Sequence, residues 1–319
     1  MRKLSFKNEK LKEFNNYLKR VKVAIIGLGV SNEPLIDYLH ELGSDITVFN
    51  NKELDNKLKN KINKYSIPAF VGENYLSSLT GFDIIFRSPS CLPNLPELER
   101  EAKHGTIITT EIEMVLELCL GTVIGITGSD GKTTTTSLIY EIVKEKGYDC
   151  FLGGNIGTPL FTKIKEMTAE TIVVLELSSF QLMNMKVSPQ IAVVTNVTPN
   201  HLDIHNSYEE YIEAKKNIFR HQNENGKVIL NYDNDITREF AKEAKGKIEF
   251  FSSSVKLENG YIIDNGIIKL CSDGLRRHIV NTKDLILRGN HNYENVCAAM
   301  AATSTLVDID TRNKSHKEF

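Results

Sequence analysis

Short apolar runs alternate with amphipathic stretches along the first half of the chain. Residues 21–27 are nearly continuous in apolar side chains, and a helical stretch follows over residues 33–42, with Asn32 at its N-cap. Further strands are expected at 46–49 and 84–86. Strands covered by helices on both faces have this continuous apolar pattern. The pattern predicts a parallel sheet packed between helices, as in a Rossmann-like domain.

The same cycle restarts after Gly121. Residues 123–127 form a second apolar strand that leads through a glycine turn into a helical stretch over 132–146. Buried strands at 172–177 and 191–195 extend this second sheet. The restart predicts a doubly wound α/β domain after the Rossmann-like one.

The second half of the chain carries a hairpin signal and a last helix. Asn265-Gly266 lies between two β-rich arms, which is typical of a two-residue hairpin turn. An Ala-rich helix is predicted over 293–306. We therefore assign an N-terminal domain to residues 1–119, a central domain to 120–309 and a polar tail to 310–319.

Composition excludes several classes of partner. The 319 residues include 41% hydrophobic and 25% charged positions, which fits a globular protein of about two domains. Lys and Arg total 39 against 41 Asp and Glu, so nucleic acid and membrane surfaces are not expected partners. No apolar run approaches the roughly 18 residues of a membrane helix, and the N-terminus lacks a secretory signal. We expect a cytoplasmic monomer.

The first glycine turn, Gly27-Leu-Gly29-Val-Ser-Asn32, follows a strand and opens a helix. Backbone amides in this setting can bind a phosphate. However, Asn32 replaces the third glycine of the dinucleotide fingerprint, and residues 49–52 offer no acid for a ribose. A nicotinamide cofactor is disfavoured. From these residues alone, a phosphate site and a ligand-free turn are equally open.

The second turn is more specific because it ends in Gly-Lys-Thr between a buried strand and a helix. Its backbone amides can form an anion-binding nest, Lys132 can supply charge to the outer phosphates, and the Thr133 hydroxyl can ligate Mg²⁺. Ile126 stands where the general P-loop pattern has its first glycine, so this is a variant. We predict an ATP site formed by Gly128, Ser129, Asp130, Gly131, Lys132, Thr133 and Thr134.

Four further segments carry a family resemblance. They are Gly153-Gly-Asn-Ile-Gly157, Leu175-Glu-Leu-Ser-Ser-Phe-Gln-Leu182, Asn196-Val-Thr-Pro-Asn-His-Leu-Asp203 and Ala214-Lys215. In this order they resemble the Mur ligase family over residues 21–302. The second segment has the form typical of the member that adds D-glutamate. The resemblance implies an N-terminal Rossmann-like, UDP-binding domain followed by a central P-loop ATPase domain.

The resemblance implies a metal site. Two Mg²⁺ ions would be held by Thr133, Glu176, His201 and a carbamylated Lys215, and Lys132 would complete the catalytic set. Read alone, Glu176 could equally be a capping acid and Lys215 a solvated lysine. Lys216 is the alternative lysine, although the spacing from His201 favours Lys215. Asp203 and His205 are interpreted as local loop residues.

The resemblance also implies the substrate contacts. Asn155, Ser178 and His201 would lie near the muramoyl group, and Asn292 and Asn295 would recognise adenine. The uridine diphosphate would contact Val30, Ser31, Asn51, Lys52 and Ser88. Three residues depart from the family pattern: Asn50 replaces an acid, Ser90 replaces a glycine, and Asp130 stands where asparagine is usual.

The implied reaction joins D-glutamate to UDP-N-acetylmuramoyl-L-alanine with ATP in peptidoglycan precursor synthesis. The γ-phosphoryl group passes to the substrate carboxylate, and the D-glutamate amine attacks the acyl phosphate. Because the sequence ends where the family's third domain should begin, we expect this chain to ligate D-glutamate poorly alone. A non-catalytic remnant that binds the UDP-precursor and ATP, and a ligase related to folylpolyglutamate synthetase, are the alternatives.

Overall fold

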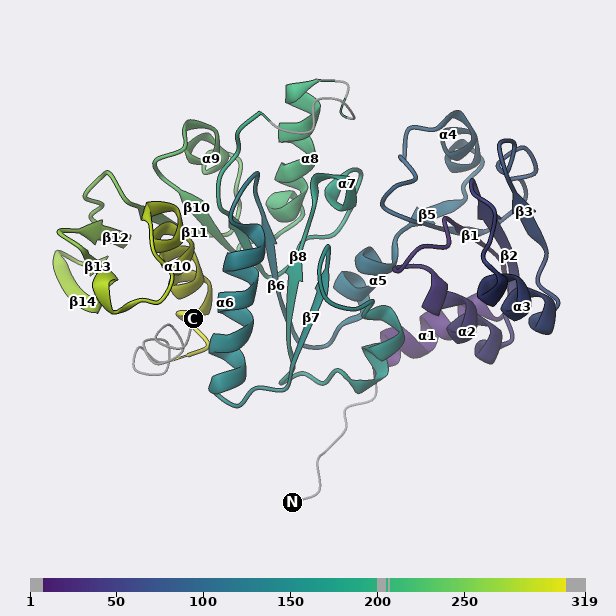
Figure 1. The fold of residues 1–319 in the computed structure, drawn as a ribbon, viewed down its shortest axis with the longest axis horizontal. Coiled ribbons are helices and arrows are strands. Elements are labelled where there is room, and N and C mark those ends of the chain that lie inside the picture. The colour runs from purple at the N-terminus through teal and green to yellow at the C-terminus, as the bar shows by residue number, and fades with distance from the viewer. Residues whose placement is uncertain (1–7, 200–204, 206, 308–319) are drawn as a thin grey trace, which may run out of the picture. The chain divides into compact units, whose positions relative to one another are not determined.

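A computed structural model describes residues 8–199, 205 and 207–307, which fall into two compact units (Figure 1). The first unit runs to Cys119 and also takes in Thr158–Thr168. The second unit comprises Leu120–Gly157 and the chain from Ala169. The return of Thr158–Thr168 to the first unit was not indicated by the sequence.

The first unit is built on a parallel sheet with the strand order β3-β2-β1-β4-β5. This is the strand order of a Rossmann-type sheet without its last strand, and it confirms the predicted class. The strands are β1 Lys22–Ile26, β2 Asp45–Asn50, β3 Ala69–Val71, β4 Ile84–Arg87 and β5 Ile107–Thr109. The helices are α1 Glu9–Leu18, α2 Glu33–Leu42, α3 Asn56–Tyr65, α4 Pro96–Lys103, α5 Glu111–Leu118 and the 3-10 helix η1 Phe161–Glu166.

Helix α2 begins where the sequence predicts, but its cap works differently. Asn32 occupies the N-cap position with helical backbone angles, and its side chain makes no capping hydrogen bond. Its Nδ2 donates to the carbonyl oxygen of Ile26 at 3.0 Å. The side chain therefore ties the glycine turn back to β1, and the expected capping role was wrong.

The second unit contains a nine-stranded sheet in the order β14-β13-β12-β11-β10-β9-β6-β8-β7. Strands β6 to β12 are parallel, and β13 and β14 are antiparallel additions at one edge. The strands are β6 Thr122–Thr127, β7 Cys150–Gly154, β8 Ile172–Glu176, β9 Ile191–Val194, β10 Lys227–Asn231, β11 Lys247–Ser252, β12 Gly260–Asp264, β13 Ile267–Ser272 and β14 Leu275–Asn281.

The predicted hairpin is confirmed at Asn265-Gly266. The two residues have φ of 51° and 72°, the left-handed conformation that a two-residue turn between β12 and β13 requires. The helices of this unit are α6 Lys132–Glu145, α7 Ser179–Leu182, α8 Tyr208–Arg220, α9 Asp235–Phe240, η2 Thr282–Asp284 and α10 Asn290–Thr303. Helix α10 starts three residues earlier than predicted, so Asn292 and Asn295 lie in its first turns.

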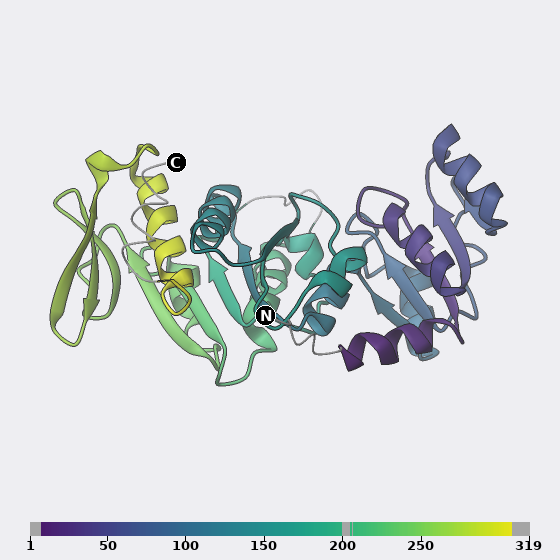
Figure 2. The same ribbon diagram turned by 90° about the horizontal axis from the view of Figure 1, so that it is seen from below.

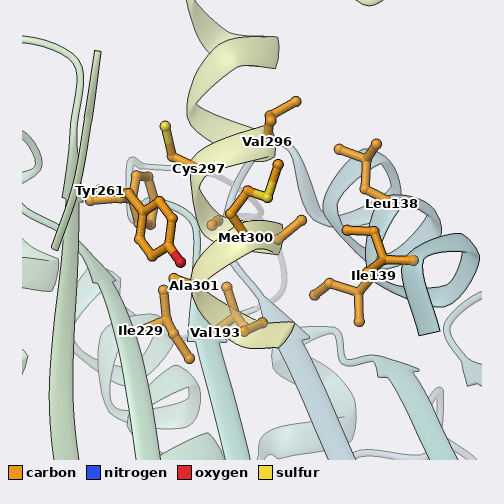
Figure 3. Close-up of a cluster of buried hydrophobic side chains, with 14 of the residues drawn as sticks. Leu138, Ile139, Val193, Ile229, Tyr261, Val296, Cys297, Met300 and Ala301 are labelled. Atoms are coloured by element: carbon orange, nitrogen blue, oxygen red, sulfur yellow. The ribbon is translucent and has the colours of Figure 1, made fainter. Parts of the chain in front are cut away.

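Helices α6 and α10 lie side by side on one face of this sheet (Figures 1 and 2). Their buried side chains share one core with alternate residues of the strands (Figure 3). The run of alanines in α10 lets the helix approach the sheet closely, since a small side chain leaves little distance to fill. The labelled members are Leu138, Ile139, Val193, Ile229, Tyr261, Val296, Cys297, Met300 and Ala301. Within the described residues, no helix is long and apolar enough to cross a bilayer.

Candidate functional site

The second sheet has its switch point at β6, which pairs with β8 on one side and β9 on the other. The chain runs from β6 to β7 on one side and later crosses from β8 to β9 on the other side of β6, so a crevice is expected at the carboxyl ends of these strands. The P-loop follows β6, Glu176 ends β8, and Thr195 and Asn196 follow β9. Segments far apart in the sequence therefore meet at one sheet edge.

Lys132 begins α6 and folds over the P-loop. Its Nζ donates to the carbonyl oxygens of Gly128 at 2.9 Å and Ser129 at 2.8 Å. Partial burial lowers the pKa of Lys132, which the nearby carboxylates of Glu176 and Asp130 oppose. An ammonium group with three donors is suited to exchange these carbonyl oxygens for phosphate oxygens.

The carboxylate of Glu176 joins two loops. It is 1% exposed, and it accepts the Thr133 hydroxyl at Oε2 and the Asn155 amide at Oε1, each at 2.8 Å. A buried carboxylate beside a P-loop hydroxyl provides the oxygen donors that Mg²⁺ takes in proteins. Thr133 and Glu176 therefore fit a magnesium ion, although the described residues contain no group of three or more His, Cys, Asp or Glu that could hold a metal.

Lys215 reaches the P-loop from α8. The side chain is 1% exposed, and its Nζ donates to the Gly128 carbonyl at 2.8 Å and lies 4.5 Å from the centre of the Tyr211 ring. Burial, with repulsion from Lys132, lowers the pKa of Lys215 to about 7. The neighbouring Lys216 instead pairs with Glu213 and Glu243 at 2.7 and 2.6 Å. Lys215 is thus the lysine that the fold brings to the loop.

A cavity of about 100 Å³ lies where these groups meet. Ser178 reaches it as the N-cap of α7, within a capping box closed by Gln181. The cavity is lined by Gly128, Lys132, Asn155, Ser178, Ser179, Phe180, Tyr211 and Lys215. His201 and Asp203 lie outside the described residues. His205 is buried behind the cavity, with Nε2 2.9 Å from Ser179 Oγ and its ring stacked on Phe180.

A second cavity of about 620 Å³ lies beside the P-loop. Among the residues that the structure describes, no lysine or arginine lines it, so it suits an uncharged part of a nucleotide better than phosphates. Asn295 Oδ1 accepts the Thr135 hydroxyl at 3.2 Å, and a Cβ at Gly131 would lie only 2.3 Å from that oxygen. The walls comprise Asp130, Gly131, Thr134, Thr195, Asn196, Thr198, Asn231, Asp233, Asn234, Phe251, His291, Asn292, Glu294 and Asn295.

Three residues that hold the P-loop were not singled out from the sequence. Tyr211 shares a hydrogen bond with Ser129 through their hydroxyl oxygens, 2.9 Å apart. Thr195 Oγ1 donates to the Asp130 carbonyl at 2.6 Å, and Asn196 bonds the same residue. The spacing of Tyr211 four residues before Lys215, on one helix face, was the available signal.

The first unit brings its predicted residues to the carboxyl ends of β1, β2 and β4. Gly27 has φ +78°, and a Cβ there would lie 2.2 Å from Ser88 Oγ, so only glycine allows the two loops to meet. Ser88 Oγ lies 3.0 Å from Ser90 Oγ. Val30, Asn51 and Lys52 are exposed, and Ser31 is partly exposed. These loops lie at the switch point of the first sheet, where this fold is expected to bind a ligand.

A larger cavity of about 1200 Å³ lies elsewhere in the second unit. It is near the amino ends of β11 and β12, where Lys247 and Gly260 begin these strands. None of the described residues that the sequence predicts to bind a ligand lines it. The size of a cavity therefore does not identify the site in this protein.

Comparison with known proteins supports the resemblance. Residues 126–303 match the profile described as the Mur ligase middle domain. UDP-N-acetylmuramoylalanine–D-glutamate ligase of Acetivibrio thermocellus is 48% identical over 98% of this chain and 67% of its own length. The enzyme of the same name from Ruminiclostridium cellulolyticum is 47% identical over 95% of this chain and 66% of its own. The chain thus spans about two thirds of the length of these relatives.

Solved structures agree on the fold. UDP-N-acetylmuramate:L-alanyl-γ-D-glutamyl-meso-diaminopimelate ligase from Neisseria meningitidis superposes with a TM-score of 0.62 at 19% identity, over 94% of this chain and 98% of that one. UDP-N-acetylmuramate-alanine ligase from Thermotoga maritima gives a TM-score of 0.52 at 20% identity, over 94% and 69% of the two chains. At these identities the likeness concerns the fold alone.

Proposed function

This chain belongs to the Mur ligase family, and we propose that it acts in the ATP-dependent ligation of D-glutamate to UDP-N-acetylmuramoyl-L-alanine. Identities of 44 to 48% to relatives named for that reaction favour this substrate over a folate. The cytoplasmic location and monomeric state expected from the sequence remain predictions.

The observation that carries the proposal is the shared carboxylate of Glu176. It binds Thr133 of the nucleotide loop and Asn155 of the glycine-rich loop, each at 2.8 Å. In the proposed function, the first loop binds the phosphates and the second binds the muramoyl end of the acceptor. A single side chain therefore aligns the donor site with the acceptor site.

The residues of the chain act mainly by alignment and charge. The acceptor carboxylate and the γ-phosphate are both anions, so their repulsion is the main barrier to approach. Lys132 neutralises phosphate charge, and Asn155 and Ser178 orient the acceptor. The substrate carboxylate then forms an O–P bond while the bond to the ADP oxygen breaks. The D-glutamate amine attacks the acyl carbon, the C–O bond to phosphate breaks, and the nitrogen loses a proton as the amide forms.

Magnesium would be held by oxygen ligands from several elements. Thr133 and Glu176 are suited to one ion, and Lys215 with His201 would serve a second. Bound there, the metal would supply positive charge that offsets the phosphate and carboxylate anions. Lys215 can provide an oxygen ligand only as a carbamate. Burial favours its uncharged amine, which is the form that reacts with carbon dioxide.

The nucleoside and the uridine diphosphate are assigned to separate places. We assign adenine to the 620 Å³ cavity with Asn292 and Asn295 in its wall. The uridine diphosphate is assigned to the switch point of the first sheet, near Gly27 and Ser88. Val30, Ser31, Asn51 and Lys52 are then the nearby contacts on the exposed side.

The Lys215 and Lys216 pair tests the proposal with a matched control. Wild-type protein should release ADP when UDP-N-acetylmuramoyl-L-alanine is added to MgATP. Lys215→Met should lower this rate at least about a hundredfold, because a metal ligand and its charge are lost. Lys216→Met should keep it. Labelled bicarbonate should mark the wild type and Lys216→Met but not Lys215→Met, as read by ¹³C NMR.

Two outcomes would overturn the proposal. ADP release that does not depend on the UDP-substrate would point to a simple NTPase. Binding of both ligands with no release, under any acceptor, would point to the non-catalytic remnant considered from the sequence.

A further inference from the structure

Asparagine side chains connect the strand ends around the second cavity. Asn196 follows β9, Asn231 ends β10, and Asn234 caps α9. The side chain of each residue makes a hydrogen bond to the backbone of a neighbouring segment. We call these three residues the asparagine ladder. All three also line the 620 Å³ cavity.

The first step of the ladder clamps the P-loop. Asn196 Oδ1 accepts the N–H of Asp130 at 3.0 Å, and its Nδ2 donates to the carbonyl oxygen of Asp130 at 3.2 Å. Thr195 Oγ1 donates to the same carbonyl at 2.6 Å. One amide side chain thus holds both backbone groups of one loop residue, as a paired strand would.

The second step holds the clamp itself. Asn234 Oδ1 accepts the N–H of Val197 at 3.3 Å, and Nδ2 donates to the Val197 carbonyl at 3.0 Å. Asn231 Nδ2 donates to the carbonyl of Thr195 at 3.0 Å. Asn231 and Asn234 therefore hold the segment after β9, and this segment in turn holds the P-loop.

The direction of the Asp130 carbonyl matters for an anion. In a trans peptide the C=O and the following N–H point in opposite directions. Because Thr195 and Asn196 bind the Asp130 oxygen, the N–H of Gly131 is turned away from them. A free carbonyl facing phosphate would repel it, whereas an N–H attracts it. The orientation of this one peptide therefore decides whether a hydrogen-bond donor or an acceptor faces the phosphate.

We propose that Asn196, supported by Asn234, is a positioning residue that holds the P-loop in its phosphate-binding shape. The proposal rests on the proposed nucleotide function of this loop. The clamp uses the backbone of Asp130 and not its side chain. Only an amide both accepts and donates in the required places.

Asn196→Ala tests the proposal through nucleotide affinity. The variant should bind MgADP about tenfold more weakly, since losing the clamp removes about 1.4 kcal/mol of loop ordering. Its affinity for UDP-N-acetylmuramoyl-L-alanine should stay within about twofold. Asn223→Ala is the matched control, because Asn223 also accepts a backbone N–H, from Asn225, but lies outside the cavity wall. Titration calorimetry measures both affinities for the wild type and for the two variants.

Asn234→Ala provides a second variant in case Asn196→Ala does not fold. It should weaken MgADP binding relative to the wild type, by less than the tenfold expected for Asn196→Ala, and wild-type affinity in Asn234→Ala would contradict its supporting role. The double variant should be no weaker than Asn196→Ala, because Asn234 acts through the same clamp. Additive effects would contradict this order.

The result that overturns the proposal is wild-type MgADP affinity in Asn196→Ala, with only the thermal midpoint lowered. That result would make the clamp a stabilising feature alone. Failure of the wild type to bind the UDP-substrate would instead refute the ligase function and leave the clamp intact. Failure of the wild type to bind MgADP would overturn the clamp.

Discussion

The side-chain amide of Asn50 links two loops of the first unit. Its Oδ1 accepts the N–H of Leu28 at 2.9 Å, and its Nδ2 donates to the carbonyl of Lys52 at 2.6 Å. An aspartate could accept the first bond but could not donate the second. The amide therefore links the first glycine turn to the chain after β2 in a way that an aspartate cannot.

Asn50→Asp should lower the free energy of unfolding by about 1 kcal/mol, the usual net value of one hydrogen bond. Urea unfolding of the variant and of the wild type measures this difference. Asn51→Asp, a charge change at an exposed neighbour, should have a smaller effect. Equal losses in the two variants would mean that charge, rather than the lost donor, is responsible.

At this scale the sequence predicts residues in local motifs well. Lys132 followed from the short P-loop string, and the choice of Lys215 over Lys216 from the family resemblance and the spacing from His201. The structure brings Lys132 and Lys215 to the Gly128 carbonyl. The capping role given to Asn32 was wrong, because its partner is the Ile26 carbonyl. Asn196 was not assigned a role because its partner, Asp130, is 66 residues away.

At the scale of elements, Glu111 holds the returning segment in the first unit. It stands in the first turn of α5, and its Oε1 accepts the N–H groups of Leu160 and Phe161, each at 2.6 Å. Phe161 is fully buried and packs edge-on against Tyr38. A carboxylate thus caps the start of η1. The segment begins directly after the loop that carries Asn155.

Burial raises the pKa of Glu111 to about 7, although its two backbone donors act in the opposite direction. The pKa in the folded state lies above the unfolded value, so the protonated form favours folding. This contribution to stability is complete below the ordinary glutamate pKa of 4.5 and is lost as the pH rises through about 7.

As the pH rises from about 5 to about 8, Glu111→Gln should become progressively more stable than the wild type, by up to about 3 kcal/mol in the free energy of unfolding. The amide oxygen of glutamine can accept the same two N–H groups, but it does not ionise. Denaturant unfolding at several pH values tests this. Glu117→Gln on the same helix is the control, and a pH-independent difference for Glu111→Gln would contradict the prediction.

Elements with strong local signals were predicted, and those that depend on distant contacts were not. The Asn265-Gly266 turn is specified by its own two residues. The membership of Thr158–Thr168 in the first unit depends on Glu111, about 50 residues earlier. Local propensity contains no information about such a contact.

At the scale of the whole molecule, each unit presents its candidate site at the carboxyl edge of a parallel sheet. In the first unit the glycine turn meets Ser88 there, and in the second the P-loop meets Glu176. The central claim is that these are the sites of a UDP-sugar acceptor and of MgATP. A ligand that binds only the folded state must raise its stability by mass action.

The most direct test is the thermal midpoint of the chain with UDP-N-acetylmuramoyl-L-alanine, with MgATP and with both. At a hundredfold excess over Kd, each ligand should stabilise its unit by about 2.7 kcal/mol, and a folate should have no effect. Upward shifts with both ligands are the predicted result. A shift with MgATP alone, at saturating UDP-substrate, would contradict the substrate assignment and leave a P-loop nucleotide-binding protein.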